Sequence, residues 1–121
     1  MALSKNVMQG GLSSGQAQAI GGQVGASLTA AGTSQGTALA LNADICFIST
    51  AAANSGVKLY AGMPGDSQIV YNAGANTVTV YPPTGAKINN AATNAGVLIA
   101  VNTFCEFFTV TTTQIIADLS A

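Results

Sequence analysis

The sequence predicts an all-β protein, a small antiparallel β-sandwich or barrel of jelly-roll or tulip-like type with an extended N-terminal arm. Two observations predict this class. Short segments of apolar and β-branched residues recur about every 8–12 residues, with Gly, Pro, Asn and Asp between them. In addition, no stretch keeps the roughly 3.6-residue apolar period of an amphipathic helix over a useful length.

Residues 1–25 differ in composition from the rest of the chain. They are rich in Gly, Ser, Gln and Ala, and the Gly pairs at positions 10–11 and 21–22 would each break a helix. Their apolar residues are too widely spaced to build a core, yet the segment is unlike a simple Gly/Ser linker. We therefore expect a flexible arm that becomes ordered on a partner, followed by a β body over residues 26–121. A tail without a role is the alternative. The predicted partner contacts of the arm are Leu3, Val7, Leu12, Ile20 and Val24.

The first half of the body contains four strand candidates. Each is a short apolar, partly β-branched segment, and Gly or Asn residues separate several of them. The segment Met63-Pro64-Gly65-Asp66 predicts a turn, because Pro presets φ near −65° and Gly accepts a positive φ. The four candidates are 27–30, 37–41, 44–50 and 57–60.

The second half contains the clearest hairpin signal in the chain. Strand candidates 68–72 and 77–81 flank the short connection 73–76, and Val78 and Val80 share one face of the second strand. After the turn at Pro82-Pro83-Thr84-Gly85 we expect a short edge strand, then two buried strands and a last strand that closes the sheet. These are residues 87–88, 96–101, 104–111 and 114–119.

The chain is unusually poor in charge. Its 121 residues include three basic residues, all lysine, and four acidic residues, which give a net charge of −1. An average soluble domain of this length carries about 30 charged residues. Here Asn, Thr, Ser and Gln supply the polar groups, and neutral polar groups cost less to cover than ions do. The composition therefore favours a surface that copies of the chain or a larger assembly cover, the alternative being a charge-poor globule.

The composition also argues against several function classes. Without a basic face, binding to nucleic acid is not expected. No continuous apolar segment is long enough for a membrane span or a secretory signal, so we expect synthesis and folding in a cytoplasm. The absence of His and the scattered acids argue against an enzyme, a metal site and a cofactor. We expect Cys46 and Cys105 to be reduced, buried thiols, with a disulfide as the alternative.

Residues 45–116 contain a core of short motifs, followed by apolar and aromatic strands that end at Thr113-Gln114. The motifs are Val70-Tyr71-Asn72, Gly74-Ala75-Asn76, Val80-Tyr81-Pro82, Gly85 and Ile88-Asn89. In these residues the segment resembles small virion-associated proteins of tailed bacteriophages. Similar chains often continue with an aromatic residue, where this one has Ile115.

The resemblance implies a capsid decoration (cement) protein without catalytic activity. Such a protein is expected to sit on the outer surface of the phage head as a homotrimer, with its N-terminal arm on the major capsid protein. Similar modules occur in head fibres and tail components, so an adhesion module that binds host-surface glycan is the alternative. The glycan alternative needs an exposed cluster of the tyrosines. Glu106 lies on the face of Phe104 and Phe108, where it either pairs with a lysine (Lys58 or Lys87) or faces a subunit boundary. The subunit-interface candidates are therefore Tyr60, Tyr71, Tyr81 and Glu106.

Overall fold

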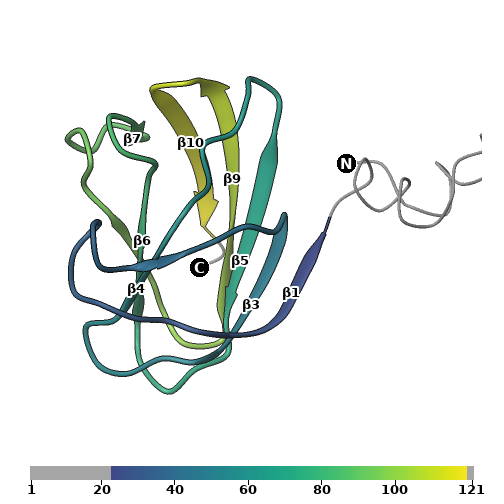
Figure 1. Ribbon diagram of the computed structural model, residues 1–121, viewed down its shortest axis with the longest axis vertical. Coiled ribbons are helices and arrows are strands. Elements are labelled where there is room, and N and C mark those ends of the chain that lie inside the picture. Colours follow the sequence, from purple (N-terminus) through teal and green to yellow (C-terminus); the bar gives the residue numbers. More distant parts are fainter. Residues whose placement is uncertain (1–22, 120–121) are drawn as a thin grey trace, which may run out of the picture.

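The computed structural model describes residues 23–119, which form ten strands in two sheets and no helix (Figure 1). The six-stranded sheet contains, in spatial order, β1 (Val24–Thr29), β3 (Ile45–Thr50), β5 (Ser67–Asn72), β9 (Thr103–Thr111), β10 (Gln114–Leu119) and β7 (Lys87–Ile88). The four-stranded sheet contains β2 (Leu39–Ala40), β4 (Gly56–Lys58), β6 (Val78–Tyr81) and β8 (Val97–Ile99).

From β1 to β9, successive strands alternate between the two sheets, which is the arrangement of a β-solenoid, and β10 then pairs with β9 in the same sheet. Each of the first three coils adds one strand to each sheet, so β1, β3 and β5 pair in parallel, as do β2, β4 and β6. Val24, Ile45 and Ile69 lie side by side in register on three successive coils. The chain then reverses, because β8 pairs antiparallel with β6, and β9 pairs antiparallel with β5.

The all-β class is confirmed, but the antiparallel sandwich or barrel is wrong for the described residues, since most neighbouring strands run parallel. The predicted hairpin of residues 68–72 and 77–81 is also wrong, because β5 and β6 belong to different sheets. The physical reason is a corner that the Asn72 side chain holds. Its Nδ2 donates to the carbonyl oxygens of Asn76 (2.8 Å) and Ile99 (3.1 Å), and its Oδ1 accepts from the backbone N–H of Gly74 (3.0 Å).

The core lies between the sheets and is built from alternate residues of each strand. On the six-stranded sheet, Cys46, Val70 and Cys105 lie in one row of the register and are fully buried. The two thiols are not bonded to each other, which confirms the expectation of reduced thiols. On the facing sheet, Val57, Val78, Val80 and Ile99 are buried. The two sheets therefore enclose a single apolar layer.

Asparagine residues form several of the turns. The predicted turn at residues 63–66 is confirmed, with Asp66 N–H donating to Met63 O at 3.0 Å and Gly65 at φ +96°. Every non-glycine residue with a positive φ in the described part of the chain is an asparagine, a residue that tolerates the left-handed region. These are Asn54, Asn89, Asn94 and Asn102.

Candidate interaction surface

The six-stranded sheet has an apolar face that the described residues leave in contact with solvent. Because strand side chains alternate, the residues between the buried ones point away from the core. Val24 is 57% exposed, Phe47 42% and Ile116 46%. We define the outer face as these outward side chains: Val24, Ile45, Phe47, Ile69, Tyr71, Phe104, Glu106, Phe108, Ile116 and Asp118.

A row of aromatic side chains crosses the outer face. Phe47, Tyr71 and Phe104 are direct neighbours in the register of β3, β5 and β9. The rings of Phe47 and Tyr71 stack with their centroids 5.4 Å apart and their planes 14° from parallel. Phe104 is 45% exposed. Aromatic side chains bury large areas at little entropic cost, so this row is suited to packing against another surface.

A pair of carboxylates interrupts the apolar surface. Glu106 of β9 and Asp118 of β10 are directly opposite each other, and Ile69 of β5 lies on the other side of Glu106. Like charges at opposed positions of neighbouring strands destabilise a sheet. Within residues 23–119 neither Lys58 nor Lys87 forms an ion pair with Glu106. Lys58 Nζ donates instead to Thr84 Oγ1 at 3.1 Å, and the Lys87 side chain is exposed.

The structure brings three of the predicted site residues together on the outer face, namely Val24, Tyr71 and Glu106. Val24 and Gly25, assigned to the arm from composition, lie in β1 beside Ile45 and Cys46. The other predicted arm contacts, Leu3, Val7, Leu12 and Ile20, lie outside the described residues.

The three tyrosines do not gather in one place. Tyr71 stacks on Phe47, whereas the Tyr60 hydroxyl donates to Asp44 Oδ1 and the Tyr81 hydroxyl donates to the carbonyl oxygen of Thr33 at 3.2 Å. Burial, and then the hydrogen bond to the Asp44 carboxylate, raises the pKa of Tyr60 above its usual range. The exposed tyrosine cluster that the glycan alternative needs is therefore not assembled from these residues.

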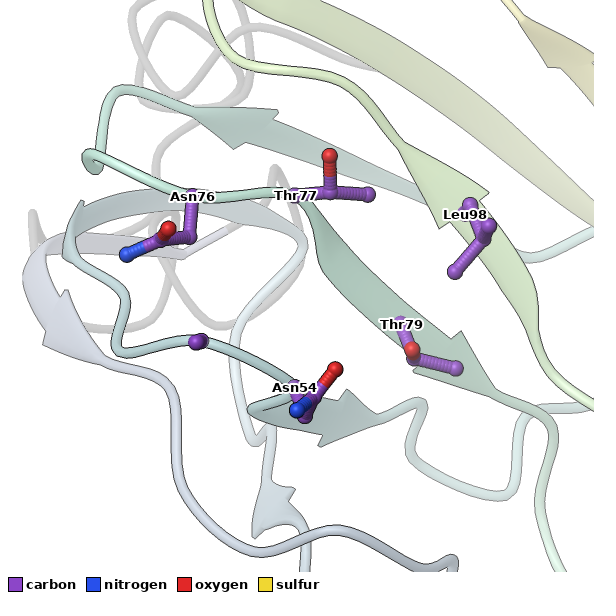
Figure 2. A pocket seen from close by; sticks show the side chains of 6 residues that line it. Asn54, Asn76, Thr77, Thr79 and Leu98 are labelled. Carbon is purple, nitrogen blue, oxygen red and sulfur yellow. The ribbon is translucent and has the colours of Figure 1, made fainter.

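A second feature lies on the side of the four-stranded sheet. A groove of about 320 Å³ is lined by small, neutral side chains, with Thr79 of β6 beside Leu98 of β8. Figure 2 shows Asn54 and Asn76 on neighbouring turns at one side of it. The amide of Asn76 is committed to the protein, since its Nδ2 donates to Ala51 O at 2.9 Å. The groove can offer hydroxyl and amide hydrogen bonds and the exposed side chain of Leu98, but no charged group.

Sequence reasoning missed part of the outer face, including Phe47, Ile69 and Ile116. It treated residues 104–111 as a buried strand, but Phe104 and Val110 of β9 are exposed. The signal was present in the sequence, because the strands are apolar at both odd and even positions. Strands that are apolar at both odd and even positions are commonly buried on both faces, whereas here one face is exposed in the described part of the chain.

No protein-family model matches the chain, and neither a curated protein nor a solved structure matches it. Within the described residues, no group of three or more His, Cys, Asp and Glu side chains is placed to hold a metal ion. A search of the same residues for an apolar helix long enough to cross a membrane found none.

Proposed function

We propose that the protein is a structural component of a tailed-bacteriophage virion, a decoration (cement) protein that binds the outer surface of the head. The observation that carries the proposal is the outer face: a sheet surface with exposed Val24, Phe47, Phe104 and Ile116, in a chain with 6% charged residues. Contiguous exposed apolar surface marks a contact with another molecule. A protein without catalytic activity, cofactor or nucleic-acid contact fits this composition.

In this proposal the two parts of the chain have different partners. The β body associates with copies of itself through the outer face, as a homotrimer, and the segment that precedes β1 contacts the major capsid protein. Ordering the arm opposes the gain from burying its spaced apolar side chains, so one arm binds weakly. Three linked arms bind far more tightly, because avidity raises affinity by about 10²–10⁴. Self-association is therefore required for occupancy of the capsid.

Deletion of residues 2–22 tests the arm and leaves β1 intact. We expect the truncated protein to associate normally but to be lost from the virion, and the shell to become less heat resistant. The measurements are copy number by quantitative mass spectrometry of purified particles and the temperature of genome release. A matched control replaces Ser4, Ser13 and Ser14 by Ala, which changes the segment without touching its apolar residues. Unchanged occupancy after the deletion would refute the proposed role of the arm.

The second candidate is a head-fibre or tail-associated adhesion module that binds host-surface glycan. It is favoured by the aromatic row of Phe47, Tyr71 and Phe104, since aromatic faces can stack on sugars, and by the neutral groove beside Asn54. The extension of the outer face by Val24, Ile45 and Ile69 favours a protein contact instead. Copy number separates the two functions: hundreds of copies per virion support a decoration protein, whereas a few to tens support a fibre or tail component.

A further inference from the structure

Three of the six acid and lysine side chains in the described part of the chain form no side-chain hydrogen bond or ion pair there. Asp44 accepts from Tyr60 and from the N–H of Gln23, Asp66 accepts from the N–H of Met63, and Lys58 donates to Thr84. No such bond is present for Glu106, Asp118 and Lys87. These three side chains are therefore the charged groups that the described fold leaves without a hydrogen bond or an ion pair.

Two of them, Glu106 and Asp118, are opposed on the outer face. An apolar partner that covered this face would take both carboxylates out of water without compensation. Removing an unpaired ion from water is among the largest costs in protein association. A cation placed between the two carboxylates by the covering surface would compensate both charges at once.

The third, Lys87, lies in the edge strand of the same six-stranded sheet. It is exposed in β7, the edge strand, beside Gln114 of β10. Around it the edge carries exposed neutral side chains, such as Asn89, Asn90 and Ala92. The edge thus presents one cation within a surface that costs little to desolvate, which is complementary to the outer face in charge.

We propose that the outer face of one copy is covered by the β7 edge of a second copy, with the second copy's Lys87 between Glu106 and Asp118 of the first. This inference rests on the proposed self-association and identifies the surfaces that carry it. The contact joins two different surfaces, and such heterologous contacts close into rings when the rotation between copies allows it. A trimer forms in this way, whereas two outer faces placed against each other would bring four carboxylates into one apolar interface.

Charge reversal tests the pairing. Lys87→Glu and the double variant Glu106→Lys/Asp118→Lys should each lower the association constant at least about tenfold, because each places like charges in the contact. Combining all three substitutions should restore association to within about threefold of the unsubstituted protein. The measurement is the distribution of oligomers by native mass spectrometry and sedimentation. Lys58→Glu is the matched control, since it makes the same charge change on the other sheet and should leave association unchanged. An unfolding transition of each variant identifies any that fails to fold.

A second measurement uses the unsubstituted protein and needs no variant. Light and ¹⁵N-labelled copies are mixed, dissociated, reassembled and treated with a carbodiimide, which joins an amine and a carboxylate in direct contact. The proposal predicts Lys87–Glu106 or Lys87–Asp118 cross-links in which one peptide is light and the other heavy. Cross-links confined to a single copy would overturn the proposal, and so would links from Lys5, which would place the N-terminal segment on the outer face.

The results separate this inference from the proposed function. If the protein assembles but charge reversal at Lys87 has no effect, the pairing is wrong and self-association stands. If the protein remains a monomer at the concentrations used for virion assembly, the proposed self-association fails, and this inference fails with it. Tenfold weakening, rescue by the combined variant and mixed-isotope cross-links together support the pairing.

Discussion

The inner and outer faces of the same strands are both apolar, but only one of them is used by the described fold. On β9, Phe107 points into the core and is 1% exposed, while on β3 Phe47 points outward and is 42% exposed. The inner side chains are enclosed by the second sheet, so their apolar character stabilises the monomer. The outer side chains contribute little to that enclosure. The difference is the basis of the proposal that another molecule covers the outer face.

The polar groups of the two faces also differ, because those of the inner face are hydrogen-bonded within the fold and the carboxylates of the outer face are not. Buried Gln68 and Asn72 are satisfied on the inner face; Gln68 exchanges two hydrogen bonds with the backbone of Tyr60, at 3.1 and 3.2 Å. No buried side-chain polar atom among the described residues lacks a partner. On the outer face, Glu106 and Asp118 oppose each other. Polar groups of the interior are therefore paired within the described fold, whereas the two opposed carboxylates of the outer face are not paired with a cation there.

The largest expected effect comes from removing an inner aromatic side chain. Phe107→Ala should lower the free energy of unfolding by about 3–5 kcal/mol, because it leaves a cavity between the sheets. Phe47→Ala should cost only about 1 kcal/mol, mainly from the lost stack on Tyr71. Urea unfolding at equilibrium measures both, at a protein concentration low enough to keep the chain monomeric. Equal losses for the two variants would contradict the distinction between the faces.

A smaller loss is expected at the Asn72 corner. Asn72→Ala removes a side chain that bonds to the backbone of Gly74, Asn76 and Ile99, and it leaves those buried groups unsatisfied. We expect a loss of about 2–3 kcal/mol in unfolding free energy. Asn90→Ala, on the exposed connection after β7, is the matched control and should change stability by less than about 0.5 kcal/mol. A loss at Asn72 no larger than at Asn90 would show that the corner does not depend on this amide.

The Asn72 corner illustrates which features of the fold can be predicted from the sequence and which cannot. Local alternation correctly located strands at residues 44–50, 68–72 and 104–111, because side-chain period and burial are local properties. It could not predict which strands pair. Whether residues 73–76 form a hairpin or lead into the other sheet depends on the Asn72 amide reaching Ile99, 27 residues away. A contact of that kind leaves no local pattern.

The candidate surface was predictable only in part, for a related reason. Val24, Tyr71 and Glu106 were identified, but they were assigned to an arm and to separate strands. Their meeting on one face requires the parallel register of β1, β3 and β5 and the antiparallel register of β9. Phe47 was missed because an apolar residue in an apolar strand gives no sign of which face it occupies.

The two inner-face thiols make the stability of the folded chain depend on pH. Burial raises the pKa of Cys46 to about 11 and that of Cys105 to about 12, above the ordinary value of 9.0. The folded chain therefore retains protons that the unfolded chain loses. This stability contribution is fully present below pH 9 and is lost as the pH rises toward the folded-state values, with a slope of at most about 1.4 kcal/mol per pH unit for each thiol.

Urea unfolding between pH 8 and pH 11 measures that slope. The double variant Cys46→Ala/Cys105→Ala should be less stable overall but should lose less stability per pH unit, because neither position can then ionise. Tyr60 is present in both proteins, so the difference in slope isolates the thiols. Identical slopes would mean that the thiols are as accessible to ionisation in the folded chain as in the unfolded one.

The smallest effect on folding, and the most informative for function, is expected at adjacent positions of β10. Ile115 is buried on the inner face, and Ile116 is 46% exposed on the outer face. Ile116→Thr keeps a β-branched side chain and should change the unfolding free energy by less than about 0.5 kcal/mol. It should nevertheless weaken association at least about fivefold, because it places a hydroxyl in an apolar contact. Ile115→Thr is the matched control and should reduce folding stability instead. If Ile116→Thr alters neither folding nor association, position 116 lies outside the contact between copies. The shared part of the outer face would then be limited to β1, β3, β5 and β9.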